Sequence, residues 1–145
     1  MVQMKRTLKL KSKSKKSGGE YTHSNIICVF LEMLNMVKLY HWKTHSISVH
    51  KATDELYSDM NSNVDEFVEA LLGKDGSRIN LTGTKSIPLY DFNSIEPFKQ
   101  KISGFKTYLE NMSKCPLLMN DSDLLNIRDE LLGKLNKFTY LLTFK

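Results

Sequence analysis

The chain has 145 residues, of which 41% are hydrophobic and 26% are charged, and its formal net charge is +5. This length suits one ordinary domain with a sizeable core and is too short for two independent domains. Seven basic residues and no acidic residue lie in the first nineteen positions, which leaves 14 basic against 16 acidic residues, a net charge of −2, for residues 20–145. The composition therefore excludes a uniformly basic nucleic-acid-binding globule and indicates a slightly acidic domain with a cationic arm.

Other classes of protein are excluded by features that the sequence lacks. No apolar run approaches the roughly 18 residues of a membrane span, and the charged N-terminus has no apolar stretch behind it, as a secretory signal would. Cys28 and Cys115 have neither the number nor the spacing of a disulfide framework or a metal pair, so we expect a reducing compartment. We predict a cytoplasmic protein that is not secreted and has no membrane partner.

Residues 1–19 form the cationic arm, in which Lys alternates with Ser and Leu before Ser17-Gly18-Gly19. Such a composition buries too little apolar surface to offset the entropy of ordering, so we predict disorder. An arm of this kind binds polyanions by neutralising phosphates, which makes a nucleic-acid partner or nucleoid association the favoured interpretation. A solubilising or localising tail and an organellar transit peptide are the alternatives, the latter weakened because the charges are mostly lysines. The candidate nucleic-acid-binding residues are Lys5, Arg6, Lys9, Lys11, Lys13, Lys15 and Lys16.

Two long helices are predicted next. From Thr22 onward apolar residues recur at spacings of three and four and also occupy other faces, so this helix should be buried on more than one side. A second helix has a single apolar stripe and ends at Gly73, a residue suited to a left-handed C-terminal cap. The stripe consists of Val49, Ala52, Leu56, Met60, Val64, Phe67 and Leu71.

The second half of the chain predicts two more helices after a long connection at 73–93, which is rich in Gly, Ser, Thr and Asn. A third helix runs from Ser94, an N-cap candidate, to Met112, and a fourth begins at Asp121 or Ser122 and reaches Leu142. No segment has the period of a strand. Residues 20–145 are therefore expected to form an all-α, ferritin-like four-helix bundle with a long connection between helices two and three.

Histidines and acids are concentrated on the first two predicted helices, and the last two contain no histidine. At about 100° per residue, the side chains of His50, Asp54, Asp65 and Glu69 fall within one stripe, about 145° from the centre of the apolar stripe. One interpretation is a solvated polar face. The other is a site for iron, manganese or zinc, because these metals accept imidazole and carboxylate ligands. Since the stripe faces away from its own core, such a site needs ligands from a second subunit.

His41 is the natural partner of this stripe because it extends the apolar side of helix one, between Tyr40 and Trp42. The alternative for His41 is a core histidine with its hydrogen bonds satisfied. His45, one turn later, is either a further ligand or exposed to solvent.

These residues resemble the signature of Dps proteins, the ferritin-like DNA-protecting ferroxidases. That family has a His-Trp pair on helix one and the pattern H-x3-[DE]-x10-D-x3-E on helix two. This chain has His41-Trp42 and then His50, Asp54, Asp65 and Glu69 at the same spacing, within residues 38–73. It departs from the family in a shorter segment between His41 and His50 and in a middle connection unlike the family's short cross-helix. If helix one ended a turn early, His45 would take the place of His41.

The resemblance implies a catalytic metal site between subunits, with His41, His50 and Asp54 from one chain and Asp65 and Glu69 from its neighbour. It also implies iron as the metal, Fe(II) oxidation by peroxide or oxygen, storage of the ferric product in a homo-oligomeric shell of dimers, twelve subunits in the family, and DNA binding through the basic tail. These functions protect cells from oxidative stress. Trp42 and Tyr57 would intercept radicals or simply pack. The intrasubunit site of ferritins is disfavoured because helices three and four lack a Glu-x-x-His pattern.

Two other classes of function remain open. A catalytically silent ferritin-like protein could keep the fold and use the arm for structural or nucleic-acid-packaging work. A plain helical interaction module could use the polar stripe only as a dimer face. The ferroxidase is the favoured interpretation because four metal-type residues occur at matching spacing.

Overall fold

A computed structural model describes residues 19–144 of the chain, so the predictions for the basic residues of the arm lie outside the described part. The described residues form four α-helices and no strand, as the sequence predicts. The helices are α1 (His23–Lys43), α2 (Ile47–Gly73), α3 (Ile95–Asn111) and α4 (Ser122–Leu141), with a short 3-10 helix η1 (Met112–Lys114) after α3. The fold class is therefore all-α.

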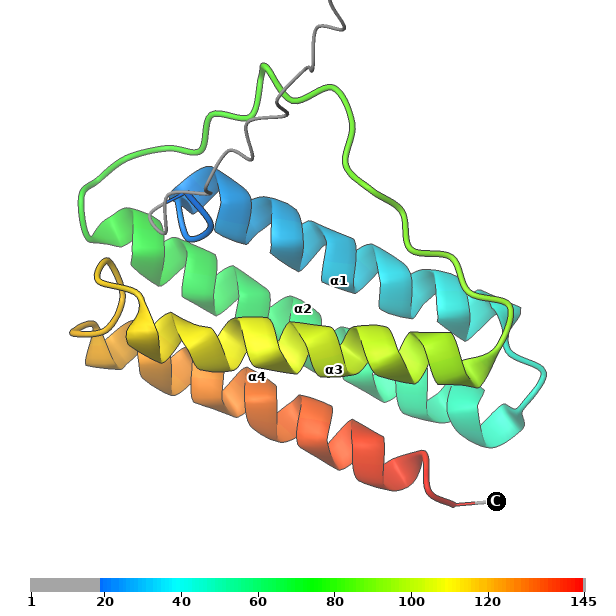
Figure 1. The fold of residues 1–145 in the computed structure, drawn as a ribbon. Helices are drawn as coiled ribbons and strands as arrows, with labels where there is room; N and C mark the ends of the chain where they lie inside the picture. Colours follow the sequence, from blue (N-terminus) through cyan, green and yellow to red (C-terminus); the bar gives the residue numbers. More distant parts are fainter. Residues whose placement is uncertain (1–18, 145) are drawn as a thin grey trace, which may run out of the picture.

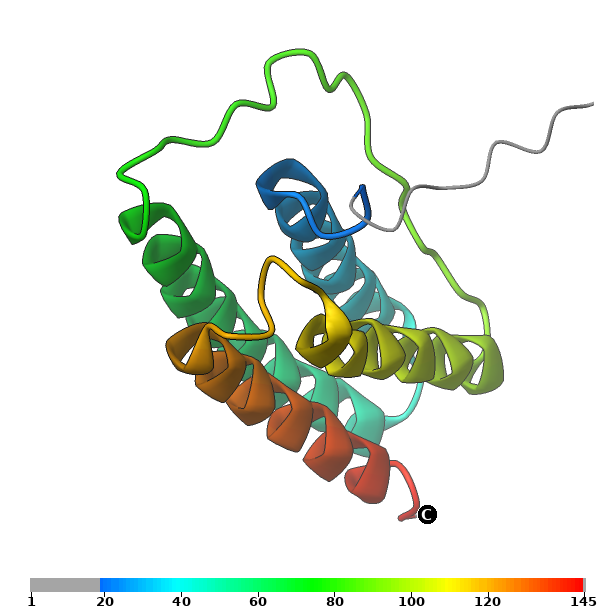
Figure 2. The same ribbon diagram turned by 60° about the vertical axis from the view of Figure 1, so that its left-hand side comes forward.

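The four helices lie side by side with every helix antiparallel to its neighbours (Figures 1 and 2). Helix α2 packs on α1 and on α4, and α3 packs on α4. Aromatic pairs close the square on the side of α1 and α3. Tyr40 of α1 stacks on Phe98 of α3 at 4.3 Å at one end, and Tyr21, two residues before α1, stacks on Tyr108 of α3 at 4.9 Å at the other. This order places the start of α2 and the start of α3 at the same end of the bundle.

Residues 74–94 form the long connection that the sequence predicts, and they run along the whole bundle from the end of α2 to the start of α3 (Figure 1). The far end of the connection is fastened to the last turn of α1. There the Lys43 Nζ donates to the Asp91 carboxylate at 2.8 Å and to the Asn93 Oδ1 at 3.0 Å. The connection thus ends beside the turn that joins α1 and α2.

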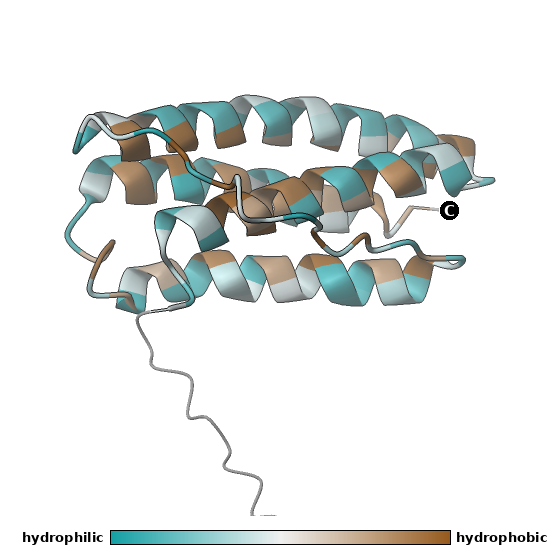
Figure 3. Ribbon diagram, turned by 90° about the horizontal axis from the view of Figure 1, so that it is seen from above, coloured by the Kyte–Doolittle hydropathy of each residue, from teal (hydrophilic) through white to brown (hydrophobic). Residues whose placement is uncertain are grey.

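Hydrophobic residues alternate with hydrophilic ones along each helix, and the hydrophobic sides meet in one core (Figure 3). Helix α1 is buried on several sides, as predicted from its all-round apolar pattern. Phe30 packs edge-on against Phe67 of α2, with ring centroids 5.2 Å apart. The buried residues of α1 are Ile26, Ile27, Phe30, Met33, Leu34, Met36, Val37, Tyr40 and His41.

The helix ends lie close to the predicted residues, but the predicted capping interactions are not formed there. Ser94 and Asp121 occupy the N-cap positions of α3 and α4, but neither side chain makes a capping hydrogen bond. The prediction of a left-handed cap at Gly73 is wrong, because Gly73 is the last helical residue of α2. The left-handed position is Gly76, with φ +69°, whose N–H bonds to the Leu72 carbonyl at 2.9 Å and closes the helix end.

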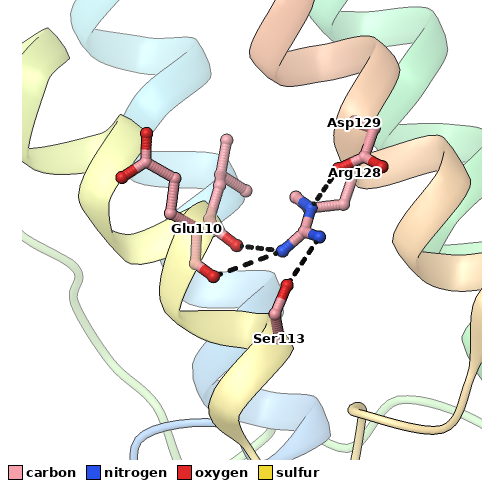
Figure 4. Close-up of polar contacts among 5 residues, drawn as sticks. Glu110, Ser113, Arg128 and Asp129 are labelled. Atoms are coloured by element: carbon pink, nitrogen blue, oxygen red, sulfur yellow. Dashed lines mark hydrogen bonds and ion pairs between the residues drawn. The ribbon is translucent and has the colours of Figure 1, made fainter.

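Arg128 of α4 is buried although it is charged, with 6% of its surface exposed. Its guanidinium donates to the Leu109 carbonyl at 2.7 Å and to the Ser113 Oγ at 2.8 Å, and its Nε donates to Asp129 at 2.8 Å (Figure 4). A cation is favourable there because the last carbonyls of α3 carry the negative end of the helix dipole. Arg128 therefore joins the C-terminus of α3 to α4.

The substitution Arg128→Met should lower the free energy of unfolding by about 2–3 kcal/mol, because it keeps the volume but removes the buried cation and its hydrogen bonds to the carbonyl end of α3. Urea unfolding monitored by circular dichroism measures the change. Arg78→Met is the matched control, since Arg78 is exposed and bonds only to the Ser77 carbonyl at 3.0 Å. Equal losses in both variants would contradict the role given to Arg128.

Candidate functional site

The candidate site begins at the three-residue turn between α1 and α2, residues 44–46. The Thr44 N–H bonds to the Tyr40 carbonyl and ends α1, while the Ser46 side chain accepts from the Val49 N–H and caps α2. The Thr44 hydroxyl also accepts from the Ser46 N–H at 3.1 Å. These bonds keep the turn short, so the last turn of α1 lies against the first turn of α2.

The short turn brings His41 and His50 together. Their rings stack with centroids 3.9 Å apart and an interplanar angle of 19°. The Nδ1 of His41 bonds to the His50 carbonyl, and the Nδ1 of His50 bonds to the His41 carbonyl, each at 2.9 Å. Because a carbonyl only accepts, both Nδ1 atoms carry a proton, and each ring is held to the other helix.

The opposite ring nitrogen, Nε2, then bears the lone pair in each neutral imidazole. Among residues 19–144 neither Nε2 has a hydrogen-bond partner. His41 is only 8% exposed, yet its Nε2 is not among the buried unpaired polar atoms of the described chain, so this atom reaches the surface. A hydrogen bond from Nδ1–H to a carbonyl with Nε2 left free is the usual arrangement of a metal-binding histidine.

Thr53 of α2 contacts His41, and no sequence pattern predicts this role. Its side chain is fully buried, and its Oγ1 lies 3.1 Å from the His41 Nδ1. The same hydroxyl donates within α2, to the Val49 carbonyl at 2.8 Å or the His50 carbonyl at 3.0 Å. It can therefore accept from His41 while its own proton is used, which gives the His41 Nδ1–H two acceptors. The contact between Thr53 and His41 depends on the short turn that brings α1 and α2 together, so residue spacing alone could not predict it.

Asp54, Asp65 and Glu69 are all exposed on α2, as the stripe predicts. None of the three forms an ion pair with another described residue. Two other acids of the same helix are paired instead with α4. Lys137 donates to Glu55 at 2.7 Å and lowers the pKa of that carboxyl, and Lys134 lies 3.5 Å from Asp59. The acids of α2 thus divide into those that fasten α4 and those that face outward.

The five predicted ligands do not meet within one chain. His41 and His50 are in contact, and Asp54 follows His50 by one helical turn. Asp65 lies eleven residues beyond Asp54, which is about 16 Å along a helix, whereas metal–ligand bonds span only about 2 Å. Accordingly, residues 19–144 contain no group of three His, Cys, Asp or Glu side chains that could hold a metal ion.

Apolar and aromatic side chains are exposed next to the histidine pair. Trp42 and Ile47 are each 69% exposed. The Lys38 ammonium lies over the rings of Trp42 and Tyr57, at 5.6 and 4.6 Å from their centroids. Large apolar side chains are therefore exposed beside the histidine pair, and one of them is partly covered by Lys38.

His45 does not take the place of His41. Helix α1 continues to Lys43, so His41 lies in its last turn, and His45 is exposed in the turn that follows. The short segment between His41 and His50 holds the two helices close enough for the rings to stack.

Comparison with known proteins places the chain in a family whose function is unknown. The model of the Family of unknown function (DUF5856) matches residues 41–142. The chain belongs to this family, and the matched segment begins at His41 and includes all five candidate ligands. No curated protein and no solved structure matches the chain. In the described part of the chain, no helix has the length and hydropathy needed to cross a membrane.

Thr53→Val should lower the free energy of unfolding by about 1 kcal/mol, because the variant removes a buried hydroxyl that bonds to His41. The ¹⁵N spectrum of the metal-free protein should show the His41 ring less fixed in its Nδ1–H tautomer. Thr53→Ser, which keeps the hydroxyl, should restore the wild-type spectrum. Thr107→Val is the control, since the Thr107 hydroxyl makes a comparable bond within α3 but touches no histidine. An unchanged His41 spectrum in Thr53→Val would refute the contact.

Proposed function

We propose that this protein is a Dps-like iron-binding ferroxidase whose metal site is completed by a second subunit. The observation that carries the proposal is the stacked pair of His41 and His50, with both Nδ1 atoms held by carbonyls and neither Nε2 atom bonded to another residue of 19–144. This pair lies one turn from the unpaired carboxylate of Asp54. Imidazole and carboxylate together suit iron, and also manganese or zinc.

The connectivity of the helices supports a ferritin-like bundle as the finer description of the fold. Helices α1 and α2 form one antiparallel pair, α3 and α4 another, and a single long connection crosses the length of the bundle between them. One long crossover is the mark of ferritin-like folds among four-helix bundles. In such folds, an inward metal site takes a Glu from each of two helices and a Glu-x-x-His pair from each of the other two. Here helices α3 and α4 have no histidine, which favours a site at the surface of α2.

Fe(II) is the substrate of the proposed reaction. Two Fe(II) ions each lose one electron, and one hydrogen peroxide takes up both electrons with two protons to give two waters. The histidine nitrogens would bind Fe(II), and the carboxylates of Asp54, Asp65 and Glu69 would hold the ferric product, which prefers hard oxygen ligands. Because both electrons reach one peroxide, no hydroxyl radical is released. The stored ferric iron would be the cargo of the assembly.

The distances between the candidate ligands along α2 require a second subunit to complete the site. Asp65 and Glu69 are too far along α2 to share an ion with His50 of their own chain, and they have no ionic partner among the described residues. Trp42 and Ile47, both exposed, would be covered by the partner. We therefore propose a homodimer as the unit of a larger shell.

The cationic arm of residues 1–19 is proposed to bind DNA. The arm contains seven basic residues and no acidic residue, whereas residues 20–145 carry a net charge of −2. The arm is therefore the part of the chain suited to phosphate contact. The division would let the bundle handle iron while the arm holds nucleic acid.

A catalytically silent ferritin-like structural or packaging protein is the second candidate. One observation favours this candidate. The described residues of a single chain bring no three metal-type side chains together. Metal analysis of the purified protein separates the two candidates. The ferroxidase should carry iron and oxidise added Fe(II), and the silent protein should do neither.

The variants His50→Ala and Asp65→Ala should each slow Fe(II) oxidation at least about tenfold, with the assembly intact, because each loses a ligand. Mixing the two inactive variants should restore activity. In a mixed dimer, one site takes the intact histidines of the Asp65→Ala chain and the intact acids of the His50→Ala chain. Random pairing of equal amounts would rebuild about a quarter of all sites. Stopped-flow absorbance of ferric iron, measured before and after subunit exchange, gives the result.

Glu66→Ala is the control for this experiment, because Glu66 is exposed beside Asp65 but lies off the stripe. Its rate should equal that of the wild type. Wild-type rates in both ligand variants would refute the site, and two inactive variants that stay inactive after exchange would refute its division between chains.

Removal of residues 1–19 should abolish DNA binding and leave Fe(II) oxidation unchanged, because the arm and the site occupy different parts of the chain. For the full chain on duplex DNA, the logarithm of affinity should fall with the logarithm of salt concentration with a slope of up to about −6, since at most seven phosphates are neutralised. Fluorescence anisotropy with a labelled duplex measures both. Loss of both activities in the truncated chain would contradict this division.

A further inference from the structure

The basic and acidic residues of this chain are segregated along its length. Residues 1–19 contain seven basic residues and no acidic residue. Residues 52–73, which make up most of α2, contain six acidic residues and no basic residue. Lysines of α4 pair with two of these acids, Glu55 and Asp59. The other four are exposed and form no ion pair within residues 19–144.

Three of the unpaired acids lie near the C-terminus of α2. We call Asp65, Glu66 and Glu69 the acidic end of α2. The negative end of the helix dipole adds to their potential, and the last turn of α2 contains no basic residue. Lys74, the first basic residue after the helix, pairs instead with Asp123 of α4 at 2.9 Å. The described residues therefore leave the acidic end of α2 without a cation.

The root of the basic arm is fixed at the same end of the bundle. Because α1 and α2 are antiparallel neighbours, the start of α1 lies beside the end of α2 (Figures 1 and 2). Just before α1, the buried Tyr21 donates from its hydroxyl to the Tyr108 carbonyl at 2.9 Å. The Asn25 side chain donates to the Gly19 carbonyl. The arm therefore leaves the bundle from a fixed point.

We propose that the basic arm docks on the acidic end of α2 of its own chain, and that DNA must displace it from there. The charges of the two segments are complementary, and both segments lie at one end of the bundle. The contact requires no ordered structure in the arm, because carboxylates attract any lysine that comes within a Debye length.

The length of the arm permits this contact. Lys13, Lys15 and Lys16 lie three to six residues before Gly19, a span of about 10–20 Å in an extended chain. Neighbouring helix axes are about 8–10 Å apart, and Glu69 lies about 6 Å before the end of α2. The three lysines therefore reach the acidic end of α2 without any rearrangement of the bundle.

Docking of the arm and DNA binding exclude each other, because one lysine cannot neutralise a carboxylate and a phosphate at once. The apparent affinity for DNA is then the intrinsic affinity scaled by the fraction of arms that are undocked. Exposed ion pairs are individually weak, so duplex DNA, with its dense row of phosphates, displaces the arm. Only this competition rests on the proposed DNA binding, whereas the docking does not.

Zero-length cross-linking tests the docking. A carbodiimide joins a lysine amine to a carboxylate that it contacts, and mass spectrometry identifies the linked peptides. The full-length protein is treated in EDTA, because Asp65 and Glu69 are also proposed metal ligands. Links from the arm to Glu66 and Glu69 should be at least about tenfold more abundant than links to Glu110, the exposed acid near the end of α3. They should fall at least about tenfold in 1 M NaCl, where the Debye length is about 3 Å.

Isotope labelling shows whether the arm and α2 belong to one chain. In an equal mixture of ¹⁴N and ¹⁵N chains after subunit exchange, the two linked peptides should carry the same label. Links that join differently labelled peptides as often as equally labelled ones would overturn docking within one chain. Links as frequent to Glu110, or links that persist in high salt, would overturn the electrostatic docking.

The double variant Glu66→Gln/Glu69→Gln tests the competition. At low salt it should bind a labelled duplex at least about threefold more tightly than the wild type, because more arms are undocked. Glu96→Gln/Glu110→Gln is the matched control, since it changes the net charge equally through two exposed acids of α3. Its affinity should stay within about twofold of the wild type. Equal gains in the two variants would overturn the competition, because net charge alone would then explain them.

The outcomes separate this inference from the proposed function. A full-length chain that binds no duplex DNA would refute the proposed DNA binding and the competition with it. Salt-sensitive cross-links to the acidic end of α2 would still establish the docking in that case. Conversely, a chain that binds DNA but gives no such cross-links would overturn the docking alone.

Discussion

The turn at residues 44–46 is the constraint on which the candidate site depends. Its three residues leave α1 and α2 no freedom to separate at this end, so His41 and His50 must stack and exchange hydrogen bonds with each other's backbone. Each ring is fixed by the opposite helix rather than by its own. The geometry of the hairpin therefore fixes both rings, and it positions two Nε2 atoms that have no hydrogen-bond partner in the described part of the chain. A metal-binding histidine is usually held in this way through its other nitrogen.

The acidic residues of α2 fall into two groups with different surroundings. Glu55 and Asp59 bind lysines of α4 and help to hold the bundle together. Asp54, Asp65 and Glu69 face away and have no ionic partner in the described part of the chain. This difference is what favours a metal-linked interface over a solvated face.

Most of the fold and part of the site could be predicted from the sequence. The periodicity of apolar residues gave four helices and a long connection, and the stripe of His50, Asp54, Asp65 and Glu69 lies outward as predicted. The left-handed cap was misplaced, because a helix can continue through Gly73 until Gly76 offers the same freedom. Thr53 and Arg128 were missed, because each acts through a contact between helices that no local pattern records.

The central claim is that one metal site takes ligands from two chains. A crystal structure of the full-length protein with Co(II), using anomalous scattering to locate the metal, tests it most directly. We expect cobalt bound by a histidine Nε2 and Asp54 of one chain together with Asp65 or Glu69 of the other. Cobalt bound only by residues of a single chain, or no cobalt beside His50, would contradict it.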